Sequence, residues 1–275
     1  MKIIESYEEY AAITGKYRKN CDYSNVFFLK NQVNSLVNAG KLSFLEADSN
    51  LYLFERCEGF SRFYFFINKD VEAGALPIKD TLVVEFVFNE PAGENQANSV
   101  QYLKRLGFKL GRRSIRMTLH NIGDFQFEEA KRDQKGIEIR YAEESDSETI
   151  RKLLLSHFDP KYAYIPAEDE LIEIIKSKRI IAARHDNNII GFEHFEIKNK
   201  VLTCWHILVT PEYQGRGIGR QLFSESHKRA AGVATSGQIW LREDNKPAMT
   251  MYRLCGYEFN GRRSDEYVLI DTDER

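Results

Sequence analysis

Several features that mark particular classes of protein are scarce or missing in this sequence. Cysteine occurs four times in 275 residues and forms no C-x-x-C pair, so neither a disulfide framework nor a metal site is indicated. No apolar run approaches the length of a membrane span, and the N-terminal residues become acidic at once, unlike a signal peptide. Lys and Arg (39) nearly balance Asp and Glu (41), so the net charge of −2 gives no general attraction to nucleic acid or an anionic membrane. We therefore expect a reduced, cytoplasmic protein with no metal and no nucleic-acid or membrane partner.

The hydrophobic content, 43% of the residues, is sufficient for two ordinary domains. A polar and charged stretch at 121–136 separates two halves, and an apolar run typical of a strand follows it directly. We place the boundary in this stretch, with one domain at 1–130 and a second at 137–275.

The second half alternates between the periodicities of strands and helices. Ser145 and Glu148 form a predicted capping box ahead of the first helix. The predicted order is β-α-α-β-β-β-α-β-α-β, an α/β layer fold. Strands are expected near 137–141, 180–184, 189–197, 201–209, 239–241 and 267–270, and helices near 150–155, 171–176, 217–230 and 247–255.

A glycine-rich turn, Gln-Gly-Arg-Gly-Ile-Gly at 214–219, joins one predicted strand to the following helix. Glycine lets the backbone approach a ligand closely and adopt positive φ, and the first N–H groups of a helix lack intrahelical partners. Such a turn favours a phosphate or pyrophosphate, to which Arg216 and Arg220 would add charge-assisted contacts. The spacing is neither that of a Rossmann turn nor that of a P-loop.

With its flanks, the turn resembles the acetyl-CoA signature of the GNAT superfamily of N-acetyltransferases, here Val209–Gly219. A second block, Asn245–Tyr257, resembles the family's Asn-x-x-Ala-x-x-x-Tyr followed by a Gly-aromatic pair. The strand at Ile137–Ala142 and the turn and strand at Asp186–Phe192 match as well, so the resemblance covers about half the chain. It implies a mixed, mostly antiparallel sheet flanked by helices, with acetyl-CoA as co-substrate and direct acetyl transfer to a primary amine of a small molecule or protein.

The resemblance also assigns roles to individual residues. It implies that Asn245 contacts the pantetheine arm and that Tyr252 lies by the thioester sulfur. A departing thiolate benefits from a proton donor, so Tyr252 is the candidate general acid. Since these two residues are seven apart, they project from one side of a helix. The full set expected to bind acetyl-CoA is Leu208, Val209, Gln214, Gly215, Arg216, Gly217, Ile218, Gly219, Arg220, Asn245 and Tyr252.

Two residues compete for the role of general base, which an amine needs because it attacks a thioester only when neutral. By strand alternation Cys204, His206 and Leu208 share one face, and His206 can accept a proton near neutral pH. Glu193 on the neighbouring strand is the rival, because many relatives of this family use a water chain to a carboxylate. Gly191 is expected to mark a bulge or a close backbone approach.

The acceptor is expected to lie over the segment 156–170, which is aromatic and then acidic, as a pocket for an amine would be. A solvated loop and helix start is the alternative reading of this segment.

The first half of the sequence contains an internal repeat of motifs found in the second half. The segment 95–102 repeats the Asn-to-Tyr spacing of 245–252 at an offset of 150 residues. A Gly-aromatic pair and a Gly-Arg-Arg-Ser string recur in both halves at nearly the same offset, which indicates two copies of one fold. The first copy has no glycine-rich phosphate turn, only Asp70–Pro77 at the corresponding place, so we expect a degenerate GNAT-like domain.

Two other functions remain open on this evidence: a non-catalytic acyl-CoA-binding module and an aminoacyl transferase that uses charged tRNA. The retained Tyr252 opposes the first, and the intact glycine turn and weak negative charge oppose the second. The oligomeric state is likewise open, with a homodimer as one alternative.

Overall fold

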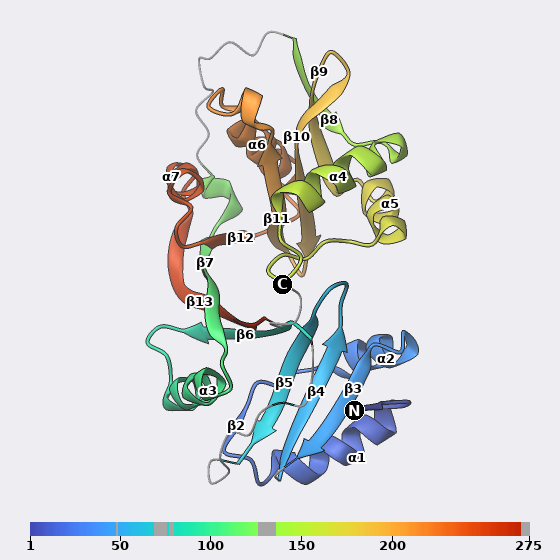
Figure 1. Cartoon of the computed structure of the whole chain (residues 1–275). Helices are drawn as coiled ribbons and strands as arrows, with labels where there is room; N and C mark the ends of the chain where they lie inside the picture. The colour runs from blue at the N-terminus through green and yellow to red at the C-terminus, as the bar shows by residue number, and fades with distance from the viewer. Residues whose placement is uncertain (48, 69–75, 77–79, 126–135, 271–275) are drawn as a thin grey trace. The chain divides into compact units, whose positions relative to one another are not determined.

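The computed structural model describes residues 1–47, 49–68, 76, 80–125 and 136–270 (Figure 1). The chain divides into two compact units: unit 1 is Met1–Arg113 with Arg263–Arg275, and unit 2 is Ser114–Arg262. The division therefore falls within two strands, β7 (Lys109–Leu119) and β13 (Glu258–Leu269), and not in the stretch 121–136. The assignment of domains to 1–130 and 137–275 stays a prediction, and the boundary between the two compact units lies elsewhere.

The strands and helices of unit 2 follow the order predicted from the sequence, except that the last predicted strand, 267–270, falls in the part of β13 that belongs to unit 1. Apart from short 3₁₀ turns and the end of β7, its elements are β8 (Ile137–Tyr141), α4 (Ser147–His157), α5 (Glu168–Lys176), β9 (Ile180–His185), β10 (Asn188–Lys198), β11 (Val201–Val209), α6 (Ile218–Ala230), β12 (Ser236–Arg242), α7 (Lys246–Leu254) and the start of β13.

The predicted capping box at Ser145 is wrong. Instead, the backbone N–H of Glu143 donates to the Asp146 carboxylate over 2.7 Å, and a 3₁₀ turn at Glu144–Asp146 precedes α4. The Asp146 carboxylate also pairs with the buried Arg184, and Asp146 is the N-cap residue of α4, without a side-chain capping bond to that helix.

The sheet of unit 2 runs in the order β7-β12-β11-β10-β9-β8. Its neighbours are antiparallel except β11 and β12, which are parallel. One face packs against α6 through Ile181, Phe195 and Leu202. Phe192 and Leu208 pack with α4 and α5 into a separate core, so helices cover both faces.

A β-bulge in β11 overturns the expectation that Cys204, His206 and Leu208 share a face. His206 pairs with His194 and Cys204 pairs with Phe195, which leaves Trp205 without a register partner. The extra residue breaks the alternation. Cys204 consequently packs with Phe223 of α6, while the ring of His206 contacts Phe158 beyond α4.

Unit 1 has the same kind of architecture. Its sheet runs β1-β3-β4-β5-β6-β13, with helices and two apolar cores. The echoed glycines Gly107 and Gly256 both follow a helix with positive φ, +93° and +89°. Except for Leu76, the segment Asp70–Pro77 lies outside the described residues. The elements are β1 (Lys2–Ile3), α1 (Tyr7–Arg18), β2 (Tyr23–Ser24), α2 (Lys30–Asn38), β3 (Leu42–Ala47), β4 (Asn50–Arg56), β5 (Ser61–Ile67), β6 (Leu82–Asn89), α3 (Glu94–Arg105) and the start of β7.

Each unit takes up a strand segment from the other half of the sequence. Residues 114–119 of β7 pair with β12 in unit 2, where Met117 is fully buried. Residues 263–269 of β13 belong to unit 1, where Ser264 donates to Glu85 over 2.7 Å and Tyr267 packs edge-on against Phe86. Both strands pass from one unit to the other within the repeated Gly-Arg-Arg-Ser strings.

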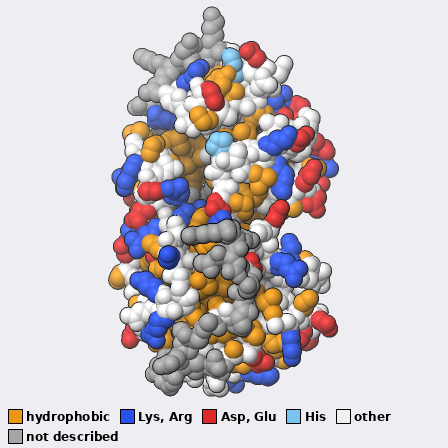
Figure 2. All heavy atoms as spheres, in the orientation of Figure 1, with side chains coloured by type: hydrophobic (Ala, Val, Ile, Leu, Met, Phe, Trp, Pro, Cys, Tyr) orange, Lys and Arg blue, Asp and Glu red, His pale blue; other side chains and the backbone are white. Residues whose placement is uncertain are grey.

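Charges are mixed on the visible, described part of the surface in Figure 2. On the face shown in Figure 2, Lys and Arg side chains are interspersed with Asp and Glu, without a basic stripe of the kind that marks a nucleic-acid footprint.

Candidate active site

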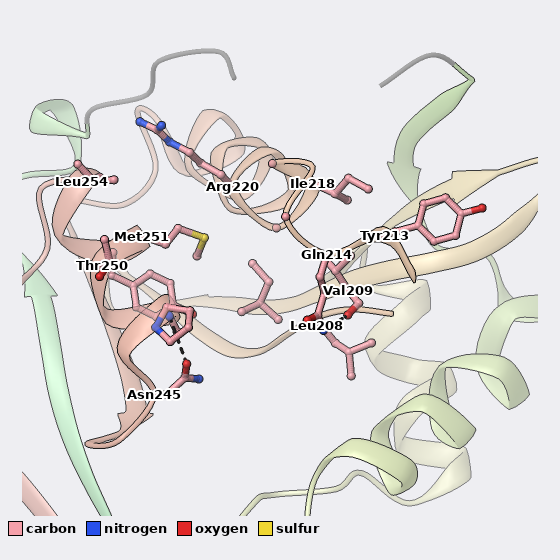
Figure 3. A pocket seen from close by; sticks show the side chains of 17 residues that line it. Leu208, Val209, Tyr213, Gln214, Ile218, Arg220, Asn245, Thr250, Met251 and Leu254 are labelled. Atoms are coloured by element: carbon pink, nitrogen blue, oxygen red, sulfur yellow. Dashed lines mark hydrogen bonds between the residues drawn. The ribbon is translucent and has the colours of Figure 1, made fainter. Parts of the chain in front are cut away.

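The site lies where two parallel strands of unit 2 separate. β11 and β12 pair from Val201↔Ser236 to Cys204↔Ile239 and no further, although both strands continue. Beyond that point a cavity of about 500 Å³ opens between the end of β11, the start of α6 and helix α7 (Figure 3). The backbone at the end of β11 is therefore free of a β12 partner, which is the arrangement that an extended ligand needs to add its own strand-like pairing.

The glycine turn borders this cavity. Gly215 and Gly217 adopt φ of +75° and +84°, a region that side chains with a Cβ disfavour, and Gly217 caps the start of α6. The amide of Gln214 donates to the Val209 carbonyl over 2.9 Å and so ties the turn to the strand. The first N–H groups of α6 carry the positive end of the helix dipole, which suits an anionic ligand.

The two arginines of the turn differ in position. Arg220 lines the cavity. Arg216 does not; its guanidinium donates to the Glu212 carbonyl over 3.2 Å and lies 4.8 Å from the centre of the Tyr213 ring. The structure thus places Arg216 at the rim of the turn and not in the cavity wall.

Helix α7 supplies the opposite wall. Asn245 caps the helix, with its side-chain oxygen accepting from the Ala248 N–H over 3.2 Å, and Figure 3 shows it at the α7 end of the cavity. Tyr252 lines the cavity and is 2% exposed, with its ring 5.0 Å from that of Phe223. Burial holds the pKa of Tyr252 well above its usual value, so its hydroxyl keeps its proton until a stronger base develops beside it.

The two candidate bases lie on opposite faces of the sheet, and neither lines the cavity. Glu193 is fully buried on the α6 face, where Ser226 donates to it over 2.9 Å. Burial raises the pKa of Glu193 to about 8. His206 is 3% exposed on the α4 face, and burial lowers its pKa to about 4.

A second histidine accompanies His206. The Nδ1 atoms of His194 and His206 are 3.4 Å apart, and the rings are nearly parallel. Burial lowers the pKa of His194 to about 3, so both rings are neutral at pH 7. Sequence reasoning missed His194, although its place opposite His206 follows from pairing the two strands.

The segment expected to cover the acceptor reaches this face. Phe158 packs edge-on against His206 with ring centres 4.9 Å apart. Tyr164 lies 5.8 Å from the Trp205 ring. The segment 156–170 therefore lies over the bulged part of β11, beside the strand end that lines the cavity.

The remaining wall of the cavity was not predicted from sequence. These residues are mostly apolar. Each lies near a predicted site residue on the same strand, turn or helix, and this proximity is the signal that could have identified them. They are Ile207, Tyr213, Pro247, Ala248, Thr250, Met251 and Leu254.

The expectation for Gly191 is confirmed. The register of β10 against β9 shifts between Ile189 and Gly191, and a Cβ on Gly191 would lie 2.7 Å from the Leu208 carbonyl oxygen. The absence of a side chain lets β10 approach the strand that borders the cavity.

Two kinds of feature are absent from the described parts of the chain. No cluster of three or more His, Cys, Asp or Glu side chains there is arranged to hold a metal ion. No described helix has the length and apolar character needed to cross a bilayer.

Comparison with known proteins agrees with this geometry. The profile described as "Acetyltransferase (GNAT) domain" matches residues 176–259. Streptothricin acetyltransferase of Streptomyces lavendulae is 34% identical over 98 residues, which are 33% of this chain and 50% of that protein. N-alpha-acetyltransferase RimI of Mycobacterium tuberculosis is 40% identical over 67 residues, 24% of this chain and 40% of that protein. The chain thus spans half or less of the length of these relatives.

A solved tandem GNAT protein from the clavulanic acid biosynthesis pathway shares the fold over most of the chain. The alignment covers 83% of each chain with a TM-score of 0.52 and 12% identity. The fold class expected from the sequence, two GNAT-like α/β domains with mixed sheets, is confirmed. Residues 176–259, which carry the separated strands, the glycine turn and Tyr252, form a GNAT acetyltransferase domain.

Proposed function

We propose that this chain is an acetyl-CoA-dependent N-acetyltransferase that transfers the acetyl group directly to a primary amine of a small molecule or a peptide. The observation that carries the proposal is the cavity between the end of β11, the start of α6 and helix α7, with a helix N-terminus and positive-φ glycines on one side and Tyr252 on the other. A generic anion site would need the turn but not the tyrosine on the opposite wall. A cytoplasmic location stays a prediction, and a homodimer remains an open alternative.

The residues present fit acetyl-CoA. The turn 214–219 and Arg220 would hold the pyrophosphate, and the unpaired end of β11 with Asn245 would hold the pantetheine arm. Acetyl-CoA supplies the acetyl group as a reactive thioester. Tyr252 would donate its proton to the departing sulfur.

The acceptor amine would approach from the α4 face, where 156–170 lies over β11. It must lose a proton before or during attack, and the two candidate bases offer different chemistry. His206 lies on the acceptor face, but its low pKa makes it a weak base. Glu193, with a pKa of about 8, is a stronger base, but it is enclosed beneath α6. We favour His206 for its position, with Glu193 as the alternative.

Calorimetric titration of the full chain with acetyl-CoA tests the binding step. Binding in the micromolar range is expected, and no heat of binding at millimolar acetyl-CoA would overturn the proposal. Tyr252→Phe tests the acid: it should bind acetyl-CoA normally but lose about 10²-fold or more in kcat, as loss of a general acid does. Full turnover by this variant would remove Tyr252 from the mechanism.

His206→Gln and Glu193→Gln separate the candidate bases. Loss of the base should lower kcat by about 10²-fold to 10⁴-fold, whereas loss of the other residue should not. If Glu193 is the base, the wild-type rate should also rise with pH up to about pH 8 on a limb that Glu193→Gln lacks. If neither variant loses activity, the amine loses its proton to solvent.

A further inference from the structure

A run of aromatic and imidazole rings leads from the interior of unit 2 to its surface on the acceptor face. The ring of Phe158 meets His206, His206 stacks on His194, and His194 stacks on Trp205 at 27°, with ring centres between 4.9 and 6.4 Å apart. Trp205 then meets Tyr164 at 5.8 Å. The first three rings are buried or half-buried, but Trp205 is 45% exposed and Tyr164 is 41% exposed.

The exposed end of this run lies beside negative charge. The carboxylate of Glu170 is close enough to the Tyr164 hydroxyl to help burial raise the pKa of this tyrosine. Glu196 lies close enough to interact with the same tyrosine and pairs with Arg179 over 3.3 Å. The histidine behind Trp205 is neutral at pH 7 because burial lowers its pKa, so the imidazole adds no positive charge beside the ring face. Of the charged side chains that act on the Tyr164 hydroxyl, two are carboxylates, Glu170 and Glu196, and one is the guanidinium of Arg179, so their sum is negative.

We infer that Trp205 and Tyr164, with Glu170 and Glu196, bind a second cationic group of the acceptor, so that the preferred substrates are diamines or polyamines. The inference rests on the proposed function. A tryptophan face is the strongest of the side-chain cation–π partners, and carboxylates beside it reinforce the attraction. A purely apolar aromatic acceptor would gain nothing from the two carboxylates.

The bound cation is not the nitrogen that reacts. A site that stabilises an ammonium raises the pKa of the amine, whereas attack on a thioester requires the neutral form. The patch therefore holds a charge while another nitrogen of the same molecule reacts. Trp205 precedes Ile207, which lines the cavity, by two residues, or about 7 Å along a strand. This separation calls for an acceptor with its charges several carbon atoms apart.

A matched pair of acceptors tests the inference: pentane-1,5-diamine and pentan-1-amine, with 2-phenylethylamine as the apolar aromatic alternative. We expect the diamine to exceed the monoamine in kcat/KM by roughly threefold to thirtyfold, the range of a single cation–π contact. Trp205→Leu should remove this preference, Trp205→Phe should retain part of it, and Glu170→Gln should reduce it. The control is Phe27→Leu, an 86% exposed aromatic side chain of unit 1, which should leave the preference unchanged.

A second readout does not depend on turnover. Calorimetry of the full chain with pentane-1,5-diamine alone should show binding that Trp205→Leu weakens and Phe27→Leu does not. If Trp205→Leu fails to fold, the same comparison is made with Trp205→Phe and Glu170→Gln.

Each result separates the inference from the proposed function. Equal kcat/KM for diamine and monoamine, with acetyl-CoA still bound, would overturn the cation subsite but leave the acetyltransferase intact. A preference for 2-phenylethylamine that Trp205→Leu removes would also overturn it, in favour of apolar recognition. Failure to bind acetyl-CoA would overturn the proposed function. In that case, diamine binding that Trp205→Leu abolishes would still support a cation site.

Discussion

Replacing Glu193 by Gln should change the pH dependence of stability in a way that an exposed carboxylate cannot. Glu193 is fully buried, and burial raises its pKa from 4.5 to about 8. Between these values the folded chain keeps a proton that the unfolded chain has lost. The free energy of unfolding therefore falls by about 1.4 kcal/mol per pH unit, or by about 5 kcal/mol across the window. Glutamine keeps the acceptor oxygen for Ser226 but has no proton to lose.

The clearest range is pH 6.5 to 8. Burial lowers the pKa of His194, His206 and His227 from 6.5 to about 3, 4 and 4, so these side chains make the fold more stable as pH rises, an effect that levels off above pH 6.5 and is the same in wild type and Glu193→Gln. From pH 6.5 to 8 the wild type should lose about 2 kcal/mol relative to Glu193→Gln. Glu266 of unit 1, whose pKa burial raises to about 7, contributes equally to both proteins.

Urea unfolding at 25 °C, measured from pH 6.5 to 8.5, gives this difference directly. The control is Glu148→Gln, which removes a carboxylate that is 78% exposed and paired with Lys152, and should show no pH-dependent difference from wild type in this range. A free-energy difference between wild type and Glu193→Gln that is the same at pH 6.5 and 8.5 would refute the reasoning.

Three further predictions follow from backbone and topology. Gly237→Ala would place a Cβ 2.1 Å from the Tyr257 hydroxyl, which is hydrogen-bonded to His227 over 2.8 Å. The free energy of unfolding, measured in urea, should therefore fall by about 1–3 kcal/mol. Adding Tyr257→Phe to this variant should restore part of the loss, and no recovery would point to a different clash. Gly217→Ala, at φ +84°, should cost about 1–2 kcal/mol and weaken acetyl-CoA binding in calorimetry, whereas unchanged affinity would mean that the turn does not hold the pyrophosphate. The fragment 137–275 lacks the β7 residues that pair with β12, so its circular dichroism spectrum should be that of a poorly folded protein. The fragment 114–262 contains all of unit 2 and should unfold in a cooperative thermal transition. Equal behaviour of the two fragments would contradict the unit boundaries.

Sequence reasoning predicted most elements of unit 2, the cavity wall on the glycine turn, and Asn245 and Tyr252 of helix α7, because these depend on local signals. Glycines that need positive φ and a helix cap such as Asn245 are readable within a few residues. The sequence could not show that β7 ends in unit 2 and β13 ends in unit 1, since the alternation of side chains along each strand is the same in either sheet. Cys204 was wrongly placed on the same face as His206 and Leu208, because one unpaired residue at Trp205 reverses the alternation and leaves no mark in composition.

Corresponding tyrosines of the two units lie in different surroundings. Tyr102, the echo of Tyr252, is 4% exposed, and its hydroxyl lies 2.7 Å from that of Tyr52, beside the buried amide of Asn50. A hydroxyl held in such a network stabilises a core. Sequence spacing alone does not distinguish this tyrosine from one that lines a cavity.

The unit assignment of β13 also sets an order of events during synthesis. Domains generally fold from the N-terminus as the chain leaves the ribosome. Unit 1 cannot follow this rule to completion, because Tyr267 and Ser264, which pack and bond against β6, are made more than 150 residues after it. Until then the edge of β6 that receives β13 is exposed, and an exposed edge invites pairing with other chains. The nascent protein should therefore be most prone to aggregation late in translation, when unit 2 is nearly complete and the first half still awaits its last strand.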